Sequence, residues 1–277
     1  MLNMIKADLF RILKGKGIYV MIIILVGIAI LSSYSLTPLS MGLNIGSGDA
    51  TYGLDEEHLE EFNKITTIGE TRELLLNYGD YELDSAIIAK NNSMYYFFIA
   101  IVVMVLCCDF SNNTIKNTIS TNISKKKYYF SKLILAMILG TMFIFLNTYI
   151  NYFINLLMNG SAFSSSLSNV TILTIQELPL LLSLISILVM IAVLVRKTAI
   201  FNSITIPFLM VAQLIIFGVV NFLNLPNKIL DFEFEMALGN LCNNPTTTYM
   251  IEVFGFWIII FVITTLIGYN SFKKRDI

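Results

Sequence analysis

The fold is decided by residues 93–158, where two apolar stretches, SMYYFFIAIVVMVLCC (93–108) and LILAMILGTMFIFLNTYINYFINLLM (133–158), flank the polar loop DFSNNTIKNTISTNISKKKYYFSK (109–132). A bilayer core of roughly 30 Å is crossed by about 20 apolar residues in a helix. The stretch 133–158 is long enough by itself. The strictly apolar part of 93–108 is short, so we expect its helix to begin earlier, with Lys90 reaching outward. These residues predict two membrane-spanning helices joined by a basic loop.

Four more apolar stretches have the length of a membrane span. They cover about residues 18–36, 172–195, 200–222 and 251–269. With 277 residues, 56% hydrophobic residues, 13% charged residues and a mean hydropathy of +0.75, the chain is too apolar for an ordinary soluble domain. We therefore predict an all-α membrane protein with six transmembrane helices and a single transmembrane domain over residues 1–277.

Charge is distributed unevenly once the loops are assigned alternately to the two sides of the membrane. Fourteen of the eighteen basic residues then lie on the side of the termini, opposed only by Asp8, Asp109 and Asp276. The other side carries sixteen of the nineteen acidic residues. Because loops rich in Lys and Arg stay in the cytosol, we expect both termini to be cytosolic in a multi-pass membrane protein.

The N-terminal residues 1–16 precede the first span and have a helical pattern. Leu2, Ile5, Leu9 and Ile12 recur at helical spacing. The pattern predicts an interfacial elbow helix whose apolar stripe lies at the acyl boundary; a frayed tail is the alternative. The basic residues expected to meet lipid headgroups are Lys6, Arg11, Lys14 and Lys16.

Two long segments are expected on the outer side. Residues 37–92 are acidic and are expected to pack on the outer ends of the spans or on another subunit. Their acidity would attract a cationic peptide, although the topology rule alone also permits an acidic outer loop. Residues 223–250 have an apolar side bracketed by Pro226 and Pro245, which predicts a short helix or helical pair dipping into the outer leaflet.

The residue inventory argues against catalysis on this chain. The sole histidine, His58, lies in the outer acidic segment, whereas zinc proteases and Ser/His/Asp hydrolases need histidine at the site. The run Lys14-Gly15-Lys16-Gly17 lacks the spacing of a phosphate-binding loop. We expect no catalytic residue, no metal, no cofactor and no nucleic-acid partner for this chain.

Several polar residues lie within the predicted spans. Asn147, Asn151, Asn155 and Asn159 repeat every fourth residue and form one amide stripe. Such a stripe must face protein or water, so it either packs helices or lines a substrate path. Glu177 and Gln213 belong to the same two alternatives, and Pro207 should kink its helix.

The loop 109–132 contains a short helical pattern. Ser111, Asn112 or Asn113 can cap it, and Ile115, Ile119 and Ile123 fall on one face. This face is flanked by Lys116 and by the lysines 125–127. The lysines alone favour anionic lipid, whereas an isoleucine face in a polar loop favours a groove on a cytosolic protein.

In this loop the chain resembles the permease subunits of bacterial type-2 ATP-binding-cassette (ABC) exporters. Those permeases have an acid-Phe-x-x-Gly-Thr-Ile-Lys-Asn pattern between spans two and three, then Ile-Ser-Arg and Tyr-x-x-Ser-Lys. This chain has Asp109-Phe110-Ser111-Asn112-Asn113-Thr114-Ile115-Lys116-Asn117, then Ile123-Ser124-Lys125 and Tyr128 to Lys132. Asn113 replaces the usual glycine and Lys125 replaces a frequent arginine. The similarity extends over the elbow and the six spans.

The resemblance implies a membrane subunit whose loop docks on a separate cytosolic ATPase. Its coupling residues would be Thr114, Ile115, Lys116, Asn117, Ile119, Ile123 and Lys125. ATP and Mg would bind the ATPase, and a second permease copy or paralogue would complete the dimer. The implied activity is efflux of an amphipathic substrate such as an antimicrobial peptide or a drug. A non-transporting membrane sensor or scaffold that holds a cytosolic partner through the basic loop is the competing hypothesis.

Overall fold

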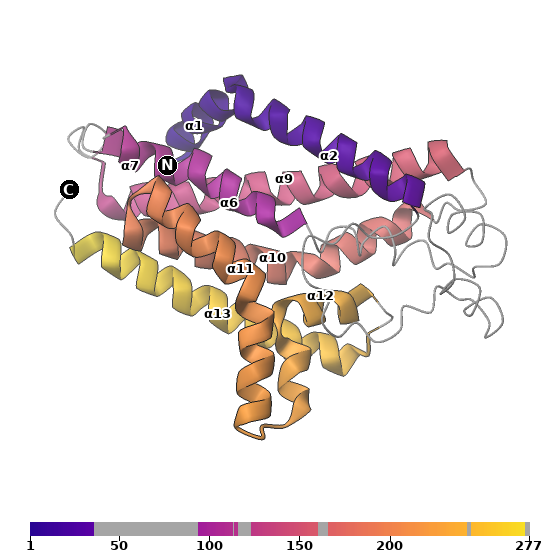
Figure 1. Cartoon of the computed structure of the whole chain (residues 1–277). Helices are drawn as coiled ribbons and strands as arrows, with labels where there is room; N and C mark the ends of the chain where they lie inside the picture. Colours follow the sequence, from indigo (N-terminus) through magenta and orange to yellow (C-terminus); the bar gives the residue numbers. More distant parts are fainter. Residues whose placement is uncertain (36–93, 113, 116–122, 160–165, 243–244, 275–277) are drawn as a thin grey trace, which may run out of the picture.

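The computed structural model describes residues 1–35, 94–112, 114–115, 123–159, 166–242 and 245–274, and this part of the chain is helical without strands (Figure 1). The remaining residues, including the predicted outer segment 37–92, lie outside the described residues. The helices in chain order are α1 (Leu2–Lys14), α2 (Lys16–Ser35), α6 (Phe97–Val102), the π turn η2 (Val103–Cys107), α7 (Cys108–Ser111), α9 (Lys125–Asn159), α10 (Leu167–Val195), α11 (Thr198–Phe222), the 3₁₀ turn η4 (Asn227–Phe232), α12 (Phe234–Cys242) and α13 (Thr247–Lys274).

Five segments of the described chain are long and apolar enough to cross a membrane. They are Met94–Ser111, Lys125–Met158, Leu167–Val195, Thr198–Phe222 and Thr247–Lys274. A sixth is obtained if α1 and α2, which meet at an angle of 61°, count as one broken span. The prediction of an all-helical, multi-pass membrane protein is therefore confirmed at this level.

Helix α9 begins before the apolar stretch that predicts it. Residues 125–132 were expected in the loop, but α9 begins at Lys125. The reason is packing, because Tyr128 and Tyr129 are buried in the core and extend the helix by two turns beyond the apolar stretch. Lysine has a good helix propensity, so the preceding lysines do not oppose this.

Helix α10 lies at the centre of the bundle and contacts α9, α11, α12 and α13. Small polar residues join it to α13: the Ser186 hydroxyl lies 2.8 Å from that of Thr264 and 3.0 Å from that of Thr265. Small side chains let two helix backbones approach closely, and the hydrogen bonds satisfy hydroxyls away from water. Helix α11 contains Pro207 and bends along its length (Figure 1), so its second half diverges from the other spans.

Candidate functional site

The two ends of the described bundle hold different elements. One end holds α1, α7, the start of α9 and the last turn of α13 with Lys273 and Lys274 (Figure 1). We refer to it as the basic end. The other end holds η4 and α12, and a pocket lies on that side of the bundle.

A cluster of paired charges joins three helices at the basic end. Lys132 Nζ lies 2.6 Å from Asp8 Oδ2 and 2.5 Å from Asp109 Oδ2. Arg11 Nη1 lies 2.7 Å from Asp109 Oδ1, and the Tyr128 hydroxyl donates to Asp109 Oδ2 at 2.8 Å. We name these five residues the Asp109 cluster. It connects α1 through Asp8 and Arg11, α7 through Asp109, and α9 through Tyr128 and Lys132.

The centre of the Asp109 cluster is removed from solvent. Only 3% of the Lys132 side chain and 5% of the Asp109 side chain are exposed, whereas Arg11 is 44% exposed. A buried charge is tolerated when partners replace its water shell, and Asp109 accepts bonds from three donors. The cluster therefore fixes the positions of α1, α7 and α9 relative to one another through directional bonds.

The first residues of the loop also contact α11 and the turn before it. The hydroxyls of Ser111 and Thr198 lie 2.9 Å apart. The Arg196 guanidinium lies 5.8 Å from the centroid of the Phe110 ring. The loop is thereby connected to the turn that joins α10 to α11.

The start of α9 contacts the basic end of α13. Lys125 Nζ donates to the carbonyl oxygen of Lys273 at 3.3 Å, and the rings of Tyr128 and Phe272 stack at 5.6 Å. The residues at the two ends of the loop are therefore bonded to three other helices at the basic end. Asp109 bonds to α1, Ser111 to α11 and Lys125 to α13.

The predicted coupling residues divide into three groups. Ile115 is buried in the core of this chain with 3% exposure, and Ile123 packs against that core. The Ile115 side chain therefore packs on its own bundle, and docking of the isoleucine face on a partner stays a prediction. The Thr114 hydroxyl donates to the carbonyl oxygen of Asp109 at 3.3 Å. Lys116, Asn117 and Ile119 lie outside the described residues.

The predicted elbow residues have a different orientation from the one expected. Ile5 and Ile12 are buried in the bundle and Leu9 packs against it, so the apolar stripe faces protein. Of the predicted stripe only Leu2 is exposed, and the other exposed apolar residues of α1 are Phe10 and Leu13. Lys6, Lys14 and Lys16 are exposed, and Arg11 belongs to the Asp109 cluster.

The predicted amide stripe is buried between helices. Asn147, Asn151 and Asn155 are each at most 3% exposed, and Asn151 Nδ2 donates to the carbonyl and side-chain oxygens of Asn147 at 2.9 and 3.1 Å. Nearby, the Thr174 hydroxyl donates to that of Thr148 at 3.2 Å, which joins α10 to α9. The bonds between Asn147 and Asn151 lie within α9, so the choice between helix packing and a substrate path stays a prediction.

The other two candidate path residues lie apart from each other. Glu177 is buried on α10, about one turn after Thr174. Thr174 bonds to Thr148 of α9, the residue after Asn147, so Glu177 lies close to the level of the amide stripe. Gln213 is half-buried on α11. The structure does not bring Gln213 to the amide stripe.

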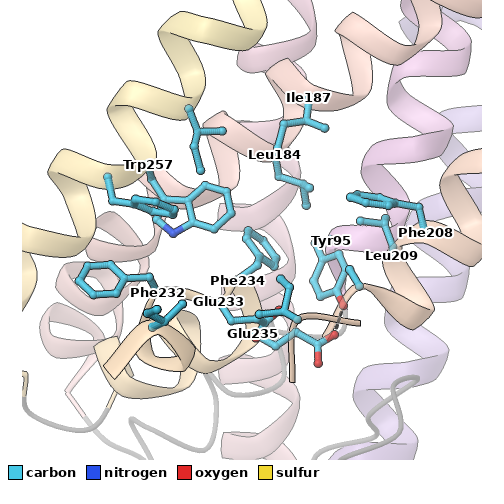
Figure 2. Close-up of a pocket in the computed structure, with 15 residues that line it drawn as sticks. Tyr95, Leu184, Ile187, Phe208, Leu209, Phe232, Glu233, Phe234, Glu235 and Trp257 are labelled. Atoms are coloured by element: carbon cyan, nitrogen blue, oxygen red, sulfur yellow. Dashed lines mark hydrogen bonds between the residues drawn. The ribbon is translucent and has the colours of Figure 1, made fainter. Parts of the chain in front are cut away.

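A pocket of about 410 Å³ lies between α10, α11, α12 and α13 (Figure 2). None of the predicted site residues lines it. Its walls are mostly aliphatic and aromatic, and two carboxylates, Glu233 and Glu235, lie at one side of it (Figure 2). The full lining is Tyr95, Leu184, Ile187, Phe208, Leu209, Ala212, Ile216, Ile229, Phe232, Glu233, Phe234, Glu235, Phe256, Trp257 and Ile260.

The aromatic residues of the pocket form a connected group. Phe234 meets Tyr95 edge to face at a centroid distance of 5.0 Å and Trp257 at 5.4 Å. Phe256 lies 5.9 Å from Trp257 and 5.5 Å from Phe232. These contacts hold the rings in fixed orientations around the pocket.

The two carboxylates are held by different bonds. Glu233 is the residue before α12, and its Oε2 accepts from the backbone N–H of Met236 at 2.9 Å, so it caps that helix. Burial raises the pKa of the Glu233 carboxyl above its ordinary value, although the Met236 N–H acts in the opposite direction. The Tyr95 hydroxyl donates to Glu235 (Figure 2).

Sequence reasoning missed the central roles of Lys132 and of the two pocket glutamates. Lys132 was detectable, because a lysine directly before one apolar span and an aspartate directly after the preceding span lie at the same membrane face. Glu233 and Glu235 were counted only as acids of an outer segment, since helix capping and burial of α12 depend on tertiary packing.

Comparison with known proteins adds a family but no described activity. No curated protein and no solved structure matches the chain. A family model with the description "Protein of unknown function (DUF2705)" matches residues 85–277, which includes the Asp109 and Lys132 positions and all lining residues of the pocket. Because that match covers most of its length, the chain belongs to the DUF2705 family.

Proposed function

We propose that this chain is the membrane subunit of an ATP-driven exporter of the type-2 ABC class. In this proposal six spans cross a bacterial cytoplasmic membrane, both termini and the loop 109–132 are cytosolic, and α1 is the elbow helix. A separate ATPase subunit binds ATP and Mg and docks on the loop. A second permease copy or paralogue completes the transport unit.

The main observation that supports this proposal is the bonding of the loop to the other helices at the basic end. The Asp109 cluster ties the first residue of the loop to α1 and α9 through Arg11 and Lys132. Ser111 and Lys125 add contacts to α11 and α13. A displacement of the loop by a docked ATPase would therefore move several span ends together, which is what a transmission element requires.

The bent pair of helices at the N-terminus supports the same function. α1 and α2 meet at 61°, and α1 is held to the loop by the bond from Arg11 to Asp109. Its exposed Leu2, Phe10 and Leu13 with the exposed Lys6 and Lys14 give it a surface suited to lipid. The elbow and the loop would thus respond to the ATPase as one unit.

The test is co-purification with candidate ATPases from the same cell, followed by ATPase and export assays. Ile119→Asp is the docking variant. Ile115→Asp is unsuitable for this purpose, because a carboxylate at this buried position would unfold the basic end. Glu252→Gln, at an exposed ion pair with Lys228 near the other end of α13, is the matched control.

Retention of an ATPase by the wild type and by Glu252→Gln, with loss in Ile119→Asp, is the expected result. If the wild-type protein retains no ATPase with Walker motifs, the exporter proposal has no source of ATP hydrolysis. That result would favour the alternative of a non-transporting membrane sensor or scaffold. Export is then measured as a resistance profile of cells with and without the subunit pair, tested against antimicrobial peptides and amphipathic drugs.

A further inference from the structure

The pocket between α10, α11, α12 and α13 combines three features that a core cavity does not need. It is lined by aromatic rings, it contains two carboxylates, and it holds an unsatisfied donor. Its volume of about 410 Å³ lies in the range of drug-sized ligand sites, roughly 300–1,000 Å³.

The rim of the pocket is exposed. Phe208, Ile229 and Phe256 each leave more than 40% of their surface uncovered, while Glu233 and Trp257 are each 6% exposed. The pocket therefore opens on the apolar outside of the bundle and becomes buried towards Glu233 and Trp257. An amphipathic molecule dissolved in the membrane would meet the opening directly.

The depth of the pocket follows from the position of Trp257 on α13. This residue is ten positions after Thr247, which corresponds to about 15 Å along the helix. The wall of the pocket formed by Trp257 thus lies within the apolar length of α13. A carboxylate in such an apolar pocket is costly unless a cation or a proton compensates it.

Glu233 and Glu235 lie on the same side of the pocket, below the aromatic rings in the view of Figure 2. Neither makes an ion pair with a basic residue in the described part of the chain. Glu233 accepts from backbone N–H groups at the start of α12, and Glu235 accepts from the Tyr95 hydroxyl. Aromatic faces attract organic cations through the ring quadrupole, and carboxylates add direct attraction. The charge and the rings together match a lipophilic cation.

A buried donor in the pocket lacks a partner. Trp257 Nε1 has no hydrogen-bond acceptor among the described residues, and its indole ring lines the pocket beside Phe234 (Figure 2). A buried donor without an acceptor costs roughly 1–3 kcal/mol. A ligand with an acceptor atom next to its charge would satisfy this donor.

We infer that the pocket lined by Tyr95, Phe232, Glu233, Phe234, Glu235 and Trp257 binds an amphipathic organic cation that enters from the membrane. This inference deepens the proposed function by naming the substrate class, and it rests on that function only for the step of export. Binding itself is a property of this chain and is measured without the ATPase.

The experiment titrates the purified full chain in nanodiscs with tetraphenylphosphonium and with tetraphenylborate. These probes have the same shape and opposite charge. Trp257 is the only tryptophan of the chain, so its fluorescence reports occupancy of the pocket directly. We expect a saturable change with the cation and at least tenfold weaker binding of the anion.

Matched variants test the role of each carboxylate. Glu233→Asn and Glu233→Asp both keep a helix-capping side chain, but only the second keeps the charge. Glu235→Gln keeps an acceptor for Tyr95. We expect about tenfold weaker binding of the cation for Glu233→Asn and Glu235→Gln, and binding within about threefold of wild type for Glu233→Asp.

Three outcomes would overturn the inference. They are equal affinity for both probes, unchanged cation binding in Glu233→Asn and Glu235→Gln, and a phospholipid that co-purifies in the pocket and is not displaced by the cation. Failure of the proposed function gives a different pattern. In that case the cation binds as expected, but no ATPase co-purifies and cells gain no resistance.

Discussion

Replacement of Lys132 by methionine is expected to destabilise the protein by about 2–4 kcal/mol. Lys132 Nζ bonds to Asp8 and Asp109 at 2.6 and 2.5 Å, and its side chain is 3% exposed. Removing one partner of a buried ion pair costs roughly 3–5 kcal/mol, because the other charge stays buried. Here Arg11 still bonds to both aspartates, at 3.3 Å to Asp8 and 2.7 Å to Asp109, which reduces the loss.

A double-mutant cycle with Asp109→Asn separates the pair from the two single losses. The single variants each leave a buried charge, whereas the double variant removes both charges. We therefore expect the double variant to be more stable than the sum of the single effects predicts, with a coupling energy of about 1–3 kcal/mol. The assay is unfolding in mixed micelles by added denaturing detergent, followed by the fluorescence of Trp257.

The control pair is Lys228 and Glu252, which lie 2.9 Å apart but are 65% and 38% exposed. Lys228→Met is expected to cost at most about 1 kcal/mol, because water already solvates both charges. If Lys132→Met and Asp109→Asn combine additively within about 0.5 kcal/mol, the two residues do not stabilise each other and the reasoning about the cluster is refuted.

Three further predictions use the same unfolding assay. Gly268→Ala is expected to lower the free energy of unfolding by about 1–3 kcal/mol, because the added Cβ would lie 2.5 Å from the Tyr129 hydroxyl and 3.4 Å from Met190 Cα. In the control Gly218→Ala the added Cβ meets nothing within 4 Å, so this variant should be neutral or stabilising. Equal changes in stability for the two variants would contradict this reasoning. Ser186→Val, which removes the bonds to Thr264 and Thr265, should cost about 1–2 kcal/mol, and no loss would show that α10 and α13 pack without them. Burial raises the pKa of Glu233 above its unfolded value of about 4.3, so ionisation of this carboxyl opposes folding. The free energy of unfolding should therefore fall as the pH rises from about 4.3 through the pKa of the folded state. Glu233→Asn should lack this fall, and identical pH profiles of stability for the variant and the wild type would disprove the prediction.

The apolar spans were predictable because each has an unambiguous length and composition. The stretches 133–158, 172–195, 200–222 and 251–269 all lie inside helices of the structure. The start of α9 was not predictable from hydropathy, since Tyr128 and Tyr129 have polar hydroxyls but bury their rings. Hydropathy averages thus locate the centre of a span better than its ends.

The candidate sites were predicted less completely than the spans. The loop was recognised from its lysines and isoleucines, but its bonding depends on a contact between Arg11 and Asp109, 98 positions apart. Helical spacing correctly gave an apolar stripe on α1, yet it could not show whether Ile5 and Ile12 face lipid or protein. Both a bilayer and a protein core accept the same apolar residues, so only the neighbouring helices decide.

The Asp109 cluster also constrains how the chain assembles during synthesis. Arg11 and Asp8 emerge first, while their partners Asp109 and Lys132 follow 98 and 124 positions behind them. At roughly 5–20 residues per second, α1 waits about 5–25 s before its partners are made. During that interval its charges stay in contact with water or headgroups, and α1 cannot settle on the bundle. The N-terminal helix therefore reaches its final position only after the start of α9 has been made.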